Sequence, residues 1–158
     1  MSILDPLIAC AGSWRGTSTL QDPGNLEPQK SSSDLTVTPV LGGRFVRLDY
    51  TWSYNEAPQE GSLLIGFDKK PETVTGHWID SFHNGNKVMA CAGPKPDGTA
   101  LCVRGSYAAP PGPDWGWRIA VIPPNDGPDE SALRIVMHNL WPEGGQEDLA
   151  VEATYTRV

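Results

Sequence analysis

The two ends of the chain carry complementary side chains, a tryptophan near the start and an arginine near the end. Gly12-Ser13-Trp14 lies close to the N-terminus and Tyr155-Thr156-Arg157 close to the C-terminus. In a closed antiparallel barrel the first and last strands pair, so these two side chains can meet. The guanidinium would then lie over the indole as a cation–π contact at one end of the barrel. This pairing predicts a closed barrel.

Short strands separated by turns fill the rest of the sequence. The chain has 17 glycines and 15 prolines among its 158 residues, well above the usual combined share of roughly 12%. We predict an all-β fold with one domain over residues 1–158, built as an antiparallel up-and-down barrel of roughly ten strands. A short helical turn over residues 4–11 would precede the first strand. A barrel is favoured over a sandwich because closure removes exposed strand edges.

One local pattern predicts the buried face of a strand, a second predicts a hairpin turn, and a third stretch is expected to form a loop. Alternation over residues 44–54 places Val46, Leu48, Tyr50, Trp52 and Tyr54 on one face of a half-buried strand. Asn84-Gly85 is the preferred dipeptide of a type I′ turn, and such a turn would place Trp78 opposite Cys91 and Asp80 opposite Met89. Residues 22–34 form the longest stretch without a strand pattern, either a flap over a barrel mouth or a flexible connection.

Charge and composition exclude several classes of partner. The formal net charge is −7 and the basic residues are scattered, so nucleic acid and anionic membrane surfaces are poor partners. The start of the chain lacks a basic segment followed by an apolar one, and no run reaches the ~18 apolar residues of a membrane span. We therefore expect a cytoplasmic protein. Three cysteines make no disulfide framework, and the three histidines lack ligand spacing, so we expect no metal site.

Asp80 is the most informative polar residue. It shares a strand face with Trp78, so an inward-facing Asp80 would be a carboxylate in an apolar interior and would need a partner. Arg104, on the following strand, could reach it. The pair is either a polar anchor for a ligand, with Tyr50, Trp52 and Trp78 as walls of a cavity, or a structural ion pair.

Six stretches carry a resemblance to a known family. They are Gly12-Ser13-Trp14-Arg15-Gly16, Gly42-Gly43-Arg44-Phe45, Leu64-Ile65-Gly66-Phe67-Asp68, Trp78-Ile79-Asp80-Ser81-Phe82-His83, Asp114-Trp115-Gly116-Trp117-Arg118 and Tyr155-Thr156-Arg157. As a set they resemble a bacterial family of unknown function with a calycin-like barrel, of the lipocalin and nitrobindin type. The resemblance implies a fold and no activity. Nitrobindins are similar in barrel plan and bind haem through a histidine on the last strand; Glu152 stands where that histidine would be expected, and a carboxylate is a poor haem ligand.

Four functions remain open at this stage. The first is a barrel that binds a small, largely apolar ligand, without a cofactor, using Tyr50, Trp52, Trp78, Asp80 and Arg104; it requires an interior void. The second is an enzyme with Asp80 as general acid or base, which requires a pKa raised towards neutrality. The third is a haem protein, and the fourth is a solid scaffold that forms a homodimer through exposed aromatic strand faces.

Overall fold

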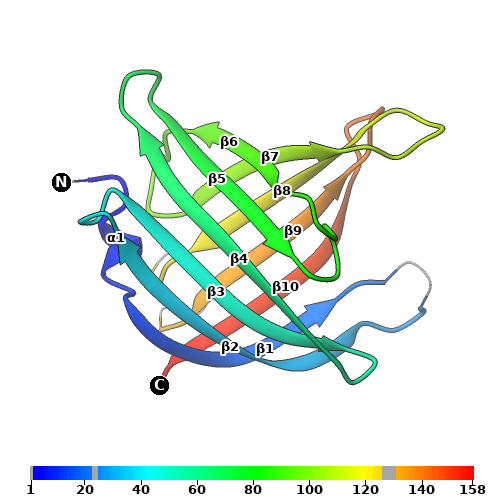
Figure 1. The fold of residues 1–158 in the computed structure, drawn as a ribbon, viewed down its shortest axis with the longest axis horizontal. Helices are drawn as coiled ribbons and strands as arrows, with labels where there is room; N and C mark the ends of the chain where they lie inside the picture. Colours follow the sequence, from blue (N-terminus) through cyan, green and yellow to red (C-terminus); the bar gives the residue numbers. More distant parts are fainter. Residues whose placement is uncertain (1, 23–24, 126–130) are drawn as a thin grey trace.

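The computed structural model describes residues 2–22, 25–125 and 131–158 as a closed β-barrel with one short helix (Figure 1). In chain order the elements are α1 (Asp5–Ile8), β1 (Gly12–Leu20), β2 (Gln29–Val40), β3 (Phe45–Tyr54), β4 (Ala57–Asp68), β5 (Thr73–Asp80), β6 (Met89–Pro94), β7 (Leu101–Tyr107), β8 (Trp115–Ile122), β9 (Leu133–Leu140) and β10 (Glu147–Arg157). No helix in these ranges has the length and apolar character needed to cross a membrane.

Each strand pairs antiparallel with its neighbours in sequence, and β1 pairs with β10 to close the ring. The predicted all-β, ten-stranded, up-and-down barrel with a helical turn before its first strand is therefore confirmed. Because the strands alternate in direction, the connections β1–β2, β3–β4, β5–β6, β7–β8 and β9–β10 all lie at one end. We call this end the mouth.

The seam between the first and last strands runs along the barrel, and its Trp14–Arg157 end lies opposite the mouth. Trp14 pairs with Arg157, whose guanidinium lies 4.5 Å from the centre of the indole. The two Nη atoms of Arg157 donate hydrogen bonds to the carbonyls of Ala11 and Ala9, both at 3.0 Å. The predicted cation–π contact is confirmed, and the same side chain also ties β10 to the segment that follows α1.

The helix α1 closes this end of the barrel. Pro6 stands in its first turn, where a proline costs no backbone hydrogen bond. Leu4 and Leu7 are almost completely buried in the core. In Figure 1, α1 and the C-terminus lie at the left, whereas the β7–β8 and β9–β10 connections lie at the right.

Strand alternation builds the core as the sequence predicted. On β3, Val46, Leu48, Tyr50 and Trp52 are buried, whereas Arg47 is exposed. The branched and aromatic side chains of this face fit the pleated surface of a sheet with one side in the core. The inner face of β3 thus delivers two polar aromatic groups, a phenol and an indole, into the barrel near its mouth.

The predicted turn at Asn84-Gly85 is wrong. Trp78 pairs with Met89 and not with Cys91, and residues 81–88 form an eight-residue connection between β5 and β6. Gly85 has φ of +59° but Asn84 is not among the described residues with positive φ, whereas a type I′ turn needs positive φ at both central positions.

The side chain of Asp80 explains the longer connection and the failure of the predicted Asp80–Met89 pairing. Its Oδ1 accepts hydrogen bonds from the backbone N–H groups of Phe82 and His83, at 2.8 and 3.0 Å. An aspartate that binds the backbone two residues onward starts a turn at once. The chain therefore leaves the β5–β6 ladder before Asn84, while Ser81 N still bonds to the Glu60 carbonyl on β4.

The expected structureless segment, residues 22–34, is also partly wrong. β2 begins at Gln29, and Ser33 is buried opposite Gly16 of β1. The Ser33 hydroxyl lies 2.8 Å from the Tyr155 hydroxyl, so a polar residue of weak strand propensity is satisfied within the sheet. Residues 23–24, where a flap would begin, lie outside the described residues.

The contacts of Arg157 predict that its replacement lowers the stability of the fold. Replacing Arg157 by Lys removes the paired donors that reach two carbonyls at once, and we expect the free energy of unfolding to fall by about 1 kcal/mol or more. Arg15→Lys is the control, because Arg15 makes an exposed pair with Asp34 and its replacement should cost less than about 0.5 kcal/mol. Urea unfolding of both variants measures the difference; equal losses would contradict this role of Arg157.

Candidate functional site

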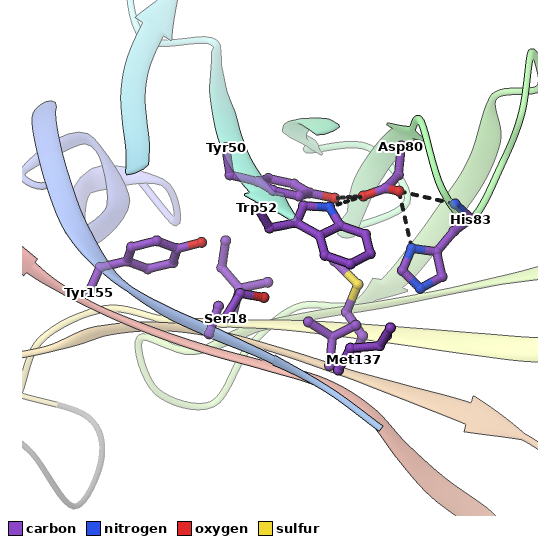
Figure 2. Close-up of a pocket in the computed structure, with 11 residues that line it drawn as sticks. Ser18, Tyr50, Trp52, Asp80, His83, Met137 and Tyr155 are labelled. Carbon is purple, nitrogen blue, oxygen red and sulfur yellow. Dashed lines mark hydrogen bonds and ion pairs between the residues drawn. The ribbon is translucent and has the colours of Figure 1, made fainter. Parts of the chain in front are cut away.

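A buried carboxylate lies at the end of β5, just below the mouth. The Asp80 side chain is 1% exposed. Its Oδ2 accepts hydrogen bonds from the Tyr50 hydroxyl at 2.7 Å and the Trp52 indole N–H at 3.3 Å. Its Oδ1 accepts two from the backbone of the turn and lies 3.1 Å from His83 Nδ1. Both oxygens of the carboxylate therefore have hydrogen-bond partners, and Figure 2 shows those from Tyr50, Trp52 and His83.

These contacts keep Asp80 ionised. Burial alone would raise the pKa of this carboxyl, but the hydrogen bond and positive charge of His83, the Tyr50 hydroxyl and the His83 backbone N–H together outweigh it. The pKa of Asp80 consequently lies below its usual value. The general acid or base that the sequence suggested needed a shift in the opposite direction, so the geometry opposes that role for Asp80.

The Tyr50 hydroxyl extends the network. It donates to Asp80 and accepts a hydrogen bond from the Trp78 indole N–H at 2.9 Å. Burial and then the Asp80 charge raise the pKa of Tyr50 well above its usual value, so the phenol keeps its proton. Trp52, Trp78 and Tyr50 are thus all oriented, directly or through one hydroxyl, by the same carboxylate.

His83 projects from the turn into the mouth. Its side chain is 15% exposed, and its ring centre lies 5.7 Å from Trp52, 5.5 Å from Trp78 and 5.3 Å from Trp117. A histidine in a connection between strands is usually solvated, whereas this one packs among aromatic rings. Asp80 folds the turn inward through its hydrogen bonds and carries the imidazole into the aromatic cluster.

Below His83 the barrel holds a narrow cavity. Its lining is mainly apolar with a few hydroxyls: Ser18, Leu20, Tyr50, Trp52, Asp80, His83, Ile135, Met137, Val151, Ala153 and Tyr155. The space left for a water molecule is only about 20 Å³, roughly what one water needs. The expected interior hollow is therefore wrong, because inward-facing side chains, among them the rings of Tyr50, Trp52 and Tyr155 drawn in Figure 2, leave little open space.

Larger spaces lie at the surface of the barrel, one of them about 490 Å³ in volume and lined by residues of β2 to β5 such as Thr36, Ser62 and Ile79. Two others lie at the mouth, beside the 81–88 turn. They have volumes of about 180 and 260 Å³, and both are lined by Phe82, His83 and Trp117. Trp117 is 6% exposed and stacks on Trp78 with ring centres 5.3 Å apart. Its indole N–H is buried and has no hydrogen-bond partner among the described residues, which is unusual for a buried tryptophan.

The structure brings together four of the five predicted site residues. Tyr50, Trp52, Trp78 and Asp80 share one network, but Arg104 does not join it. Its side chain is 63% exposed and lies 3.8 Å from Glu147 on the outer face of the barrel. The predicted Asp80–Arg104 pair is therefore wrong, because the neighbouring inward positions of β7 belong to Leu101 and Val103.

Neither the last strand nor the cavity fits a haem. Glu152, the position compared with a haem-binding histidine, pairs with Arg134 at 3.0 Å. Its neighbours Val151 and Ala153 line the cavity instead, so position 152 alternates to the outer face. A cavity with room for about one water cannot accept a porphyrin. Across the ranges that the structure describes, no group of three or more His, Cys, Asp or Glu side chains could hold a metal ion.

Because Asp80 is buried and ionised, we expect Asp80→Asn to destabilise the protein by an amount that depends on pH. The amide nitrogen of asparagine would be a donor facing the donors that now bind the carboxylate. We therefore expect the free energy of unfolding to fall by about 2–4 kcal/mol near neutral pH. Because the folded-state pKa of Asp80 is lowered, its contribution is present above pH ~4 and is lost as pH falls through the folded value. Urea unfolding at pH 6 and pH 3 should show the gap between wild type and variant shrinking at the lower pH.

Asp34→Asn is the control for this experiment. Asp34 makes an exposed pair with Arg15, and its replacement should change stability by less than about 0.5 kcal/mol at pH 6. A gap for Asp80→Asn that is equally small, or that widens towards pH 3, would show that Asp80 is not held as an ionised acceptor.

Comparisons with known proteins agree with the fold. The structure is similar over 100% of its length to that of Rv2717c from M. tuberculosis (98% of that chain, TM-score 0.63, 13% identity). It is similar, again over 100% of its length, to the S-type phycobiliprotein lyase CPES from Guillardia theta (93% of that chain, TM-score 0.59, 14% identity). No curated protein matches the sequence. A family model matches residues 5–157, and the chain therefore belongs to the family described as "Protein of unknown function (DUF1579)".

Proposed function

We propose that this barrel binds a small, largely apolar ligand at its mouth, between the 81–88 turn and the aromatic side chains beside it. The observation that carries this proposal is a pair of spaces at the mouth, of about 180 and 260 Å³, that Phe82, His83 and Trp117 line together. Burial of apolar ligand surface against these rings would supply the binding free energy, at about 25 cal/mol per Å².

The shape of the site favours the mouth over the interior. The inner cavity holds about one water, whereas each mouth space exceeds the ~150 Å³ that accommodates a benzene-sized molecule. Aromatic rings supply most of the surface of the larger space, which is lined by Trp78, Phe82, His83, Asn84, Met89, Tyr107 and Trp117. Such a surface suits flat apolar molecules, which gain from stacking as well as from burial.

The network beneath the mouth holds this surface in place. Trp78 is bound to the Tyr50 hydroxyl and stacks on Trp117, while the backbone of Phe82 is bound to Asp80. Three walls of the site are thus fixed before a ligand arrives, which lowers the entropic cost of binding. In this proposal Tyr50, Trp52 and Asp80 act as supports of the binding surface, and Trp78 contacts the ligand.

Phe82 provides the test. It is 40% exposed, lines both mouth spaces and packs edge-on against Trp52. We expect 2-methoxynaphthalene, a neutral aromatic probe, to quench tryptophan fluorescence saturably, and Phe82→Ala to weaken its affinity roughly fivefold. Native mass spectrometry of freshly purified protein would reveal a co-purified molecule directly.

The matched control is Ile79→Ala. Ile79 is a large apolar residue with similar exposure, 47%, next to Asp80 on the outward face of β5. Its replacement should leave the affinity unchanged. Equal effects of the two variants, or no saturable binding together with no co-purified molecule, would refute a ligand site at the mouth.

A further inference from the structure

We propose that the apolar ligand of the mouth carries a carboxylate group, which Lys87 binds in a polar space beside the aromatic one. This inference rests on the proposed function and names the chemical class of the ligand. It follows from two adjoining spaces of different character and from the charged side chains around them. The ligand would lie across both spaces, with its apolar body against the aromatic walls and its acid group at Lys87.

The two spaces adjoin at the 81–88 connection. The aromatic space of about 260 Å³ and a second space of about 340 Å³ share four lining residues, namely His83, Asn84, Met89 and Tyr107. The other walls of the aromatic space are rings, whereas the second space is completed by Lys87, Val88, Ser106 and Ala108. An ammonium and a hydroxyl thus lie directly beside an aromatic surface. Such a pair of spaces suits a molecule with an apolar body and one polar end.

Lys87 supplies the positive charge of the second space. Its backbone is held by the connection that Asp80 begins: the Asn84 side-chain amide donates to the Trp78 carbonyl at 3.0 Å, and the Lys87 N–H donates to the Asn84 carbonyl at 3.0 Å. None of the ion pairs formed among the described residues includes Lys87. Its ammonium is therefore available as the counter-ion of a ligand carboxylate, and the Ser106 hydroxyl can donate a second hydrogen bond.

The rest of the lining does not oppose an anion. Neither space has an aspartate or a glutamate among its described lining residues. His83 is either neutral or positive, and burial raises the pKa of Tyr107, so that its phenol keeps its proton at neutral pH. The Asp80 carboxylate lines neither space. Although the net charge of the chain is −7, a carboxylate at this position faces a nearby cation.

The remaining mouth space gives weaker support to a cationic ligand. Asp22 and Asp148 line this space of about 180 Å³, but both carboxylates already accept hydrogen bonds within the protein. The Tyr54 hydroxyl donates to Asp22 at 2.7 Å, and the Trp141 indole N–H donates to Asp148 at 2.8 Å. The polar space beside Lys87 is also the larger of the two. Charge and room therefore both favour an acid group at Lys87.

Three naphthalene probes of similar size test the charge of the ligand: 2-naphthoate, the neutral ether 2-methoxynaphthalene and the cation 2-naphthylmethylammonium. Titration calorimetry at neutral pH and low salt measures their affinities. We expect 2-naphthoate to bind about fivefold tighter than the ether, because an ion pair with Lys87 adds to the same ring contacts. We expect the ammonium probe to bind no tighter than the ether.

Variants assign this preference to one side chain. Lys87 is exposed, so Lys87→Met should fold, and the naphthoate-to-ether affinity ratio should fall to within about twofold. Lys95→Met is the matched control: it removes the same charge from the β6–β7 connection, at the opposite end from the mouth, where Lys95 pairs with Glu72 at 3.3 Å. The ratio should stay near fivefold. Phe82→Ala should weaken both probes alike, because Phe82 lines the aromatic space and not the polar one.

The possible failures are distinguishable. Wild-type protein that binds naphthoate no tighter than the ether would overturn the carboxylate assignment and leave ligand binding at the mouth intact. A ratio that survives Lys87→Met, or that falls equally in Lys95→Met, would overturn the role of Lys87. Tightest binding of the ammonium probe would overturn the assignment in favour of a cation. Absence of binding by all three probes would overturn both this inference and the proposed function.

Discussion

The burial of a single charge, the Asp80 carboxylate, determines how the mouth of this barrel is built. An ion removed from water must be surrounded by donors or it destabilises the fold. Here the donors come from β3, through Tyr50 and Trp52, and from the turn that follows β5. Satisfying one charge therefore fixes two aromatic walls and the path of a loop at the same time.

The two ends of the barrel are closed in different ways. At one end α1 and the Arg157 guanidinium close the ring through apolar packing and carbonyl hydrogen bonds. At the other end the turn held by Asp80 narrows the opening and presents His83 at its edge. The interior is left nearly full, whereas spaces lined by aromatic rings remain at the mouth. Rigid support beneath exposed recognition groups is the arrangement expected of a binding site.

Some of this could be predicted from the sequence. The inward face of β3 could be predicted because it depends on local alternation. Closure of the barrel could be predicted because it brings together one pair of side chains, a tryptophan and an arginine near the chain ends. The 81–88 connection could not be predicted, since the Asn84-Gly85 signal is local and the Asp80 carboxylate overrides it. The outward direction of Arg104 follows from alternation along β7, where Leu101 and Val103 take the inward positions, so the Asp80–Arg104 pair was a wrong prediction that the local pattern could have prevented. How completely aromatic rings fill the barrel depends on their rotamers, which no sequence pattern specifies.

The tautomer of His83 tests most directly whether the buried Asp80 carboxylate orients the side chains at the mouth. In ¹⁵N-labelled protein, with the His83 signals identified by their loss in His83→Phe, we expect a proton on Nδ1 and a bare Nε2 when the ring is neutral, because Nδ1 faces the Asp80 carboxylate. A neutral ring with its proton on Nε2 would contradict this expectation, because Asp80 would then not be the acceptor that holds His83 in the mouth.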